Sequence, residues 1–201
     1  MSPRRITRRL LACTATVLLF FGIARAADDP ASFIADLGKR AVDVLTSHLA
    51  EPQREAQFRA LFEEGFDVPA IARFVLGPYW RTATDSQRQE FTNLFEAYIV
   101  HAYTVRFSQY NNQQFKIQAT RPENSTTSLV VSQITQPDNK PPVNVDWRVA
   151  KIGSGYKIED VLVEGISMAV TERQEIASVI QRNGGQIDAL LKLLREKSGR
   201  G

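Results

Sequence analysis

One short stretch of the chain has the residue types of a catalytic serine turn. Gly165-Ile166-Ser167-Met168-Ala169 lies between a strand-like and a helix-like segment, and it loosely resembles the G-x-S-x-G turn of hydrolases, with Ala169 in place of the last glycine. Those hydrolases place their catalytic histidine after the serine, whereas His48 and His101 both precede Ser167. The predicted strands also lack the βαβ rhythm of that fold. We therefore interpret Ser167 as a hydroxyl in a strand-to-helix turn.

Metal and acid–base chemistry also have little support. His48 and His101 form no H-E-x-x-H or other ligand spacing, and we interpret them as a residue near a helix end and a partly buried residue of a long helix. Adjacent acids such as Glu159-Asp160 need not share a site, and we expect them on the solvated surface. The sequence contains no glycine-rich phosphate loop. It therefore favours binding over catalysis, with no metal site and no catalytic residue.

The first 26 residues are typical of a secretory signal peptide. Arginines at positions 4, 5, 8 and 9 precede the apolar stretch Leu10–Ile23, and Ala24-Arg25-Ala26 provides a cleavage site. A membrane anchor is the alternative, but these 14 apolar residues are fewer than the ~20 that span a bilayer. We expect a signal peptide at 1–26, with Sec export favoured over twin-arginine export, and a single mature domain at 27–201.

Removal of the signal peptide changes the charge of the chain. The peptide holds five of the 25 lysines and arginines and none of the 22 acidic residues, so the mature chain has 20 basic and 22 acidic residues, a net charge of −2. A basic surface for nucleic acid is therefore not supported. The only cysteine, Cys13, leaves with the signal peptide, which rules out a disulfide in the mature chain. Export without disulfides suits a bacterial periplasm.

Apolar periodicity predicts helices at both ends of the mature chain. Thr84 and Gln87 match the S/T-x-x-E/Q capping box at the start of the longest helix, and Gly184-Gly185 can end a later helix in a left-handed cap. Tyr79 and Trp80 lie just before the capping box, in an expected connection. The predicted helices cover residues 30–50, 54–66, 70–76, 84–109, 171–182 and 186–197.

Alternation of apolar and polar residues predicts four strands between these two groups of helices. Val143, Val145, Trp147 and Val149 alternate with polar residues, and the hairpin turn Gly153-Ser154-Gly155 follows. The four predicted strands cover residues 115–119, 129–134, 143–149 and 156–163. Helices followed by strands and then by further helices indicate an α+β fold with an antiparallel sheet.

Two motifs together resemble the MlaC / toluene-tolerance family. Gly77-Pro78-Tyr79-Trp80-Arg81-Thr82-Ala83-Thr84, with Gln87 and Glu90-Phe91, is similar to the family signature G-x-Y-W-R-x-A-T-x-x-Q-x-x-E-F. The segment 160–168, DVLVEGISM, is similar to the family's D-V-x-V-E-G-[VI]-S-[LM]. The segment that follows departs at Ile176, where phenylalanine is more usual. The resemblance covers nearly the whole mature chain and includes a hopanoid-associated branch of the family.

The resemblance implies a soluble periplasmic carrier of phospholipid. It implies a twisted antiparallel four-stranded sheet, flanked by N-terminal and C-terminal helices, in a nuclear-transport-factor-like core with an apolar cavity. Such a carrier moves lipid between membranes and maintains outer-membrane lipid asymmetry. Its implied partners are an inner-membrane ABC transporter with an MCE-domain protein and an outer-membrane lipoprotein complex, and it needs no cofactor besides the bound lipid.

Three alternatives stay open at this point. The cavity can hold a hopanoid or another apolar ligand in place of phospholipid. The same open α+β fold can support an enzyme that uses His101 or an acidic residue of the pocket. A chain with a filled core can instead act as an adaptor that recruits membrane complexes through its surface.

An apolar cavity is energetically sufficient for such a carrier. Each buried methylene contributes about 0.8 kcal/mol, so ten of them contribute roughly 8 kcal/mol without any charged contact. Trp80 is expected to anchor its loop to the core and to border the cavity, and Arg81 to pair locally or to meet a head group. The candidate lining residues are Phe74, Leu76, Trp80, Phe95, Tyr98, Tyr103, Phe107, Val131, Val145, Trp147, Ile158, Val161, Ile166 and Met168.

Overall fold

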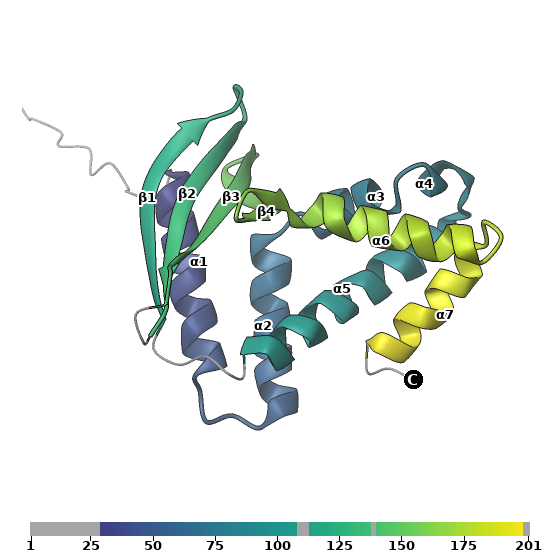
Figure 1. The fold of residues 1–201 in the computed structure, drawn as a ribbon, viewed down its shortest axis with the longest axis horizontal. Coiled ribbons are helices and arrows are strands. Elements are labelled where there is room, and N and C mark those ends of the chain that lie inside the picture. The colour runs from purple at the N-terminus through teal and green to yellow at the C-terminus, as the bar shows by residue number, and fades with distance from the viewer. Residues whose placement is uncertain (1–28, 108–112, 138–139, 199–201) are drawn as a thin grey trace, which may run out of the picture.

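The computed structural model describes residues 29–107, 113–137 and 140–198, and the predicted signal peptide lies outside this part of the chain. The described residues form an antiparallel sheet with helices before and after it, which confirms the predicted α+β fold (Figure 1). The helices are α1 (Pro30–Leu45), α2 (Glu51–Gly65), α3 (Val68–Leu76), α4 (Tyr79–Thr82), α5 (Asp85–Phe107), α6 (Met168–Arg182) and α7 (Ile187–Lys197). The strands are β1 (Gln114–Pro122), β2 (Thr127–Thr135), β3 (Val143–Ile152), β4 (Gly155–Val163) and β5 (Ile166–Ser167).

The sheet is a simple meander in the order β1-β2-β3-β4-β5, and every neighbouring pair is antiparallel. Four of these strands were predicted, and β5 is an addition. A tight turn at Glu164 and Gly165, with φ of 50° and 76°, folds the chain back on β4 and pairs Ile166 with Val163. A two-residue strand is too short for the alternation of apolar residues to reveal it. Within the described residues, no helix is long and apolar enough to cross a membrane.

Two predicted helix boundaries near the N-terminus were wrong. Helix α1 ends at Leu45 rather than at residue 50, because the hydroxyls of Thr46 and Ser47 donate hydrogen bonds to carbonyls of its last turn. Helix α2 begins at Glu51, three residues earlier than expected. Pro52 does not interrupt it, because a proline in the first turn has no helical hydrogen bond to lose.

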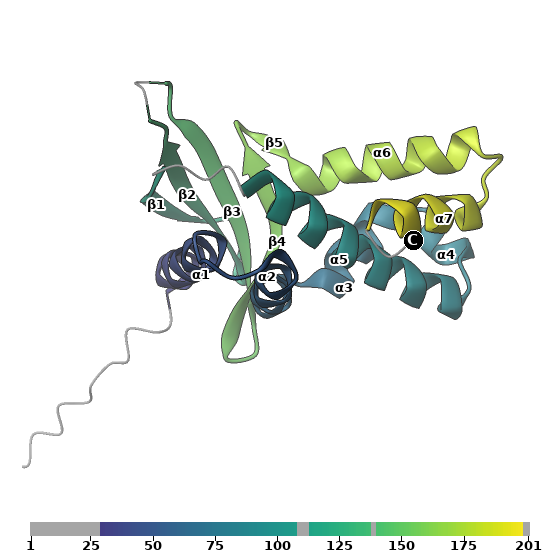
Figure 2. The same ribbon diagram turned by 90° about the horizontal axis from the view of Figure 1, so that it is seen from below.

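The molecule has two arms with separate hydrophobic cores. Helices α1 and α2 cover one face of the sheet, here called the inner face, while α3 to α7 form a helical arm beside the sheet (Figures 1 and 2). The helical core is built by buried residues of α3, α5, α6 and α7. The sheet core contains Ile34, Leu37, Leu61, Val130, Val149 and Ile158.

A small third cluster, here called the seam, joins the two arms. It consists of Phe62, Val68 and Val100, which are all buried. Phe66 packs against both the seam and the sheet core, and Ile99 packs against both the seam and the helical core. The two hydrophobic cores are therefore connected through a few aromatic and aliphatic side chains and do not merge into one continuous core.

The aromatic stretch before the capping box is a short helix rather than a plain connection. Tyr79 and Trp80 begin α4, and both are half-buried against the helical core, as expected for an anchor of this segment. The predicted capping box is confirmed. The Gln87 amide donates to Thr84 Oγ1 at 3.1 Å, and the Thr84 amide donates to Gln87 Oε1 at 3.0 Å.

A buried carboxylate ties helix α6 to the sheet. Asp160 was predicted on the solvated surface, and this prediction was wrong. Its Oδ1 accepts from the amides of Val161 and Ala169 at 2.9 and 3.1 Å. Its Oδ2 accepts from Ser167 Oγ at 2.6 Å and from Arg148 Nη1 at 3.0 Å. Four donors from β3, β4, β5 and α6 compensate for the loss of water, and they fix the start of α6 at the edge of the sheet.

We predict that Asp160→Ala destabilises the fold by about 3 kcal/mol, because it leaves several buried donors without their acceptor. The neighbouring change Glu159→Ala is the control, since Glu159 is less buried, and it should cost no more than about 0.5 kcal/mol. Urea unfolding followed by circular dichroism measures both values. Equal stability of the two variants would contradict the role given to Asp160.

Candidate functional site

The strand register sorts the apolar residues of the sheet onto its two faces. Val130, Trp147 and Val161 lie opposite one another across β2, β3 and β4, so they share a face. That face is the inner face, because all three pack with residues of α1 and α2 in the sheet core. Successive strand residues point to opposite faces. Val131, which is paired with Asp146, therefore lies on the outer face and away from the other predicted sheet residues.

Three further apolar residues form a row at the less covered end of the inner face. Val145 pairs with Val163, and Val163 pairs with Ile166, so the row crosses β3, β4 and β5 on the same face as Trp147. We call Val145, Val163 and Ile166 the edge row. Its exposure increases outward: Val145 is buried, Val163 is half-buried and Ile166 is 62% exposed. An apolar side chain this exposed at the end of a buried row marks a surface on which an apolar ligand can rest.

Two helices of the helical arm, α5 and α6, have one end near the sheet (Figures 1 and 2). Helices α5 and α6 both run from the sheet into the helical arm, and their sheet-side ends lie apart (Figure 1). Each also has an exposed valine near its sheet-side end, Val105 on α5 and Val170 on α6. On the inner face, the Trp147 indole donates to Ser132 Oγ at 3.0 Å, which satisfies its one polar atom and leaves the ring as apolar surface.

The fourteen predicted lining residues do not all gather at this place. Val145, Trp147, Ile158, Val161 and Ile166 share the inner face, although Ile158 is fully buried in the sheet core. Leu76 and Phe95 are buried in the helical core, and Trp80 and Tyr98 are half-buried against it. Tyr103 and Met168 are half-buried in α5 and α6. Phe74 is exposed on α3, Val131 lies on the outer face, and the side chain of Phe107 lies outside the described residues.

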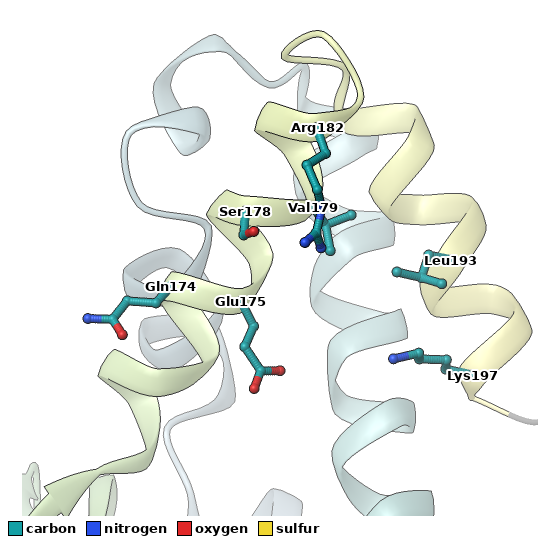
Figure 3. Close-up of a pocket in the computed structure, with 7 residues that line it drawn as sticks. All are labelled: Gln174, Glu175, Ser178, Val179, Arg182, Leu193 and Lys197. Atoms are coloured by element: carbon teal, nitrogen blue, oxygen red, sulfur yellow. The ribbon is translucent and has the colours of Figure 1, made fainter.

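Two surface grooves lie on the helical arm, and the sheet residues named above line neither of them. One has a volume of about 450 Å³ and runs between α6 and α7 (Figure 3). Glu175 and Lys197 point toward each other across it. The other groove has a volume of about 830 Å³ and lies along α3, α4 and α6. Trp80 and Phe74 line this second groove, so they belong to a different surface from the edge row.

A carboxylate on α6, Glu172, lies near enough to Tyr98 of α5 to affect its pKa. Burial is the main cause that raises the pKa of Glu172 above its ordinary value of 4.5, and the charge of Glu175 adds to it, while Lys197 acts in the opposite direction. Burial also raises the pKa of Tyr98, followed by the charges of Glu172 and Glu175. The region between α5 and α6 therefore disfavours negative charge.

The site contains no recognisable catalytic arrangement in the part of the chain that the structure describes. Ser167 Oγ accepts from the Val170 amide at 3.1 Å and donates to Asp160, so it caps α6, as the turn interpretation predicted. His101 Nδ1 lies 3.4 Å from Glu55 Oε2 on α2. Among the described residues, no group of three or more histidines, cysteines and acids is placed to hold a metal ion. The chemistry offered is contact with apolar groups.

This geometry defines the class of the protein: a single-sheet α+β domain with two cores and an apolar sheet edge left partly open. The chain belongs to the MlaC family, whose model, described as MlaC protein, matches residues 36–196. The predicted family is thereby confirmed.

Known proteins of this kind match parts of the chain. The toluene tolerance protein ttg2D of Pseudomonas putida is 28% identical over 123 residues, which cover 61% of this chain and 57% of that protein. The intermembrane phospholipid transport system binding protein MlaC of Haemophilus influenzae is 23% identical over 128 residues, which cover 62% and 58%. The chain thus matches less than two thirds of the length of either relative.

A solved structure shares the fold over a longer range. The phospholipid-binding protein of Ralstonia solanacearum, determined in complex with a phospholipid, superposes with a TM-score of 0.73 at 21% identity. The superposition covers 86% of this chain and 98% of that one. At this identity the likeness concerns the fold.

We predict that Glu172→Gln stabilises the protein at neutral pH. A raised pKa means that the native state holds the proton more tightly than the unfolded chain does, so the wild type loses stability as the pH rises from 4.5 through the native pKa. Glutamine carries no charge, so the variant should exceed the wild type above this window and match it near pH 4. Urea unfolding at a series of pH values measures the difference.

The exposed glutamate of α7, Glu196, provides the control for this pH series. Glu196→Gln should follow the wild-type pH profile. A loss of stability in Glu172→Gln at pH 7 would show instead that the carboxylate makes a favourable interaction, with Lys197 as the nearest opposite charge.

Proposed function

We propose that the mature chain is a periplasmic lipid carrier that holds the acyl chains of a phospholipid against the apolar inner face of its sheet. The observation that carries this proposal is the agreement in fold with a phospholipid-binding protein solved with its lipid, across nearly all of that chain. Family membership and the names of the two relatives point in the same direction.

The proposed acyl-chain surface starts from the edge row and continues along the inner face. Val145, Val163 and Ile166 supply its open end, and Trp147 and Val161 continue it toward the sheet core. Tyr98 and Tyr103 of α5 and Met168 of α6 are proposed as the contribution of the helical arm, since all three are half-buried. Phe74 and Val131 lie on other surfaces and are left out of this proposal.

Apolar contact alone can hold a lipid on this surface. Ten methylenes removed from water contribute roughly 8 kcal/mol, which offsets much of the cost of leaving a bilayer. The raised pKa of Glu172 indicates a poorly hydrated environment between α5 and α6, and a poorly hydrated space suits acyl chains better than an anionic phosphate. We therefore propose that the head group stays at the open end, near solvent.

The remaining parts of the proposal concern the cellular role. Residues 1–26 act as the export signal, and 27–201 form one lipid-binding domain. The carrier exchanges lipid with an inner-membrane ABC transporter that carries an MCE-domain protein and with an outer-membrane lipoprotein complex, and it thereby maintains outer-membrane lipid asymmetry. It acts by binding and release rather than as an enzyme, and its only small-molecule partner is the lipid.

We predict that native mass spectrometry of the freshly purified mature chain shows a bound phospholipid, and that Ile166→Asp reduces the bound fraction at least fivefold. A charge at the exposed end of the edge row must be desolvated when the lipid binds, whereas the fold tolerates it because Ile166 is already in water. The matched control is Ile152→Asp. Ile152 is 47% exposed and lies beside the β3–β4 turn, away from the edge row.

The possible outcomes distinguish a phospholipid carrier from a carrier of another apolar ligand and from a protein that carries no lipid. Phospholipid in the wild type and in Ile152→Asp, with little in Ile166→Asp, supports the proposed surface. A hopanoid in place of phospholipid would redirect the proposal to another apolar ligand. Repeated recovery of empty protein, under conditions in which the Ralstonia protein retains its phospholipid, would overturn it.

A further inference from the structure

The second groove of the helical arm is rich in arginine. It has a volume of about 830 Å³ and is lined by Asp67, Pro69, Ala70, Arg73, Phe74, Gly77, Pro78, Trp80, Arg81 and Arg173. These residues come from α3, α4, the turn between them, and α6. We call this feature the arginine groove. None of the residues assigned to the proposed acyl-chain surface lines it.

The arginine groove concentrates positive charge on one surface of the helical arm. Its lining contains Arg73, Arg81 and Arg173 but only one carboxylate, Asp67, whose Oδ1 already accepts from the Ala70 amide at 3.1 Å to cap α3. Across the described ranges, no salt bridge involves any of these three guanidinium groups. Residues 27–201, the proposed mature chain, have in contrast a net charge of −2. Three unpaired guanidinium groups in one concave surface attract an anionic partner.

The geometry holds one of these arginines in place before any partner binds. The Arg173 guanidinium lies over the Phe74 ring, 5.1 Å from its centroid, and Phe74 itself is 43% exposed. Arg173 also crosses the α3–α4 turn at Gly77. A β-carbon there would lie 2.9 Å from Arg173 Nε, and the backbone φ of +60° favours glycine as well. Gly77 thus leaves the space that Arg173 needs.

Trp80 forms one wall of the groove and is held by packing and by Arg88. Arg88, outside the groove, lies 5.9 Å from the centre of the Trp80 ring and donates from Nε to the Trp80 carbonyl at 2.8 Å. Trp80 is also packed on the helical core. The groove therefore presents a packed aromatic side chain beside three guanidinium groups, and aromatic and arginine side chains are typical of protein-binding surfaces.

We propose that the arginine groove docks an acidic segment of a partner protein. The planar guanidinium fork binds carboxylates in a bidentate way, and a concave groove fits a protruding segment of chain. A lipid bilayer is a poorer fit, since its surface is broad whereas the groove is concave and lined by three arginines. The inference rests on the proposed function, because it gives the chemistry of a partner with which the carrier exchanges lipid.

Trp80 allows this docking to be measured directly. The chain has two tryptophans, so Trp147→Phe leaves Trp80 as the single fluorescent reporter inside the groove. A hexaglutamate peptide is the probe, titrated at low and at high salt. We expect a saturable change in Trp80 emission that weakens as the salt concentration rises. Arg73→Glu combined with Arg81→Glu should weaken binding at least tenfold.

The matched control reverses the same amount of charge elsewhere. Arg121→Glu combined with Lys192→Glu changes two exposed cations outside the groove, and it should alter binding no more than about twofold if the effect is local. Equal weakening by both double variants, or no response to the peptide up to millimolar concentration at low salt, would overturn the proposal. A response to phosphatidylglycerol vesicles without a response to the peptide would also overturn it, in favour of a membrane surface.

Lipid content separates this inference from the proposed function. Native mass spectrometry of the Arg73→Glu/Arg81→Glu variant, made in the wild-type chain, should show as much bound phospholipid as the wild type. If the wild type also lacks lipid, the carrier proposal fails, while the peptide titration still decides whether the groove binds acidic chains.

Discussion

The arrangement of the whole molecule depends on one buried carboxylate. Asp160 receives four hydrogen bonds from β3, β4, β5 and α6, and its pairing with Arg148 is continued to Glu123 through two further hydrogen bonds. A buried charge with fewer partners would be strongly destabilising, so the start of α6 is held where these donors meet. This position sends α6 away from the sheet and toward α3 and α7. The helical arm therefore builds its own core instead of closing over the sheet.

Two cores joined by a small seam leave apolar surface that one continuous core would cover. The sheet core is closed by α1 and α2, whereas the edge row lies beyond them and ends at the exposed Ile166. Burying such residues would stabilise the fold by about 25 cal/mol for each Å² of apolar surface removed from water, and the exposed edge does without this stabilisation. The same fold buries Phe91, Val100 and Ile158 completely. An apolar edge that stays exposed in such a fold is available for contact with a ligand or a partner.

Local patterns predicted the elements well, because capping and alternation are properties of neighbouring residues. The Thr84–Gln87 box and the left-handed Gly184-Gly185 are where the sequence placed them. Properties that depend on distant pairing could not be predicted in this way. Val131 and Val145 look equally apolar in sequence, yet the register of β2 on β3 puts them on opposite faces. Asp160 looked like a surface acid because its four donors come from three other segments and one neighbour.

The same limit applies to the site, where apolar residue type did not distinguish packed core from open surface. Leu76 and Phe95 are buried in the helical core, whereas the half-buried Val163, which was not among the predicted lining residues, stands between Val145 and Ile166. Helix α6 connects the two proposed surfaces, since it follows β5 directly and carries Arg173 in its second turn. With a rise of 1.5 Å per residue, Met168 and Arg173 lie only about 7.5 Å apart along the axis. A rigid helix moves as one body, so a force applied at Arg173 acts on the sheet-side end of α6, where the Asp160 network holds it to the sheet.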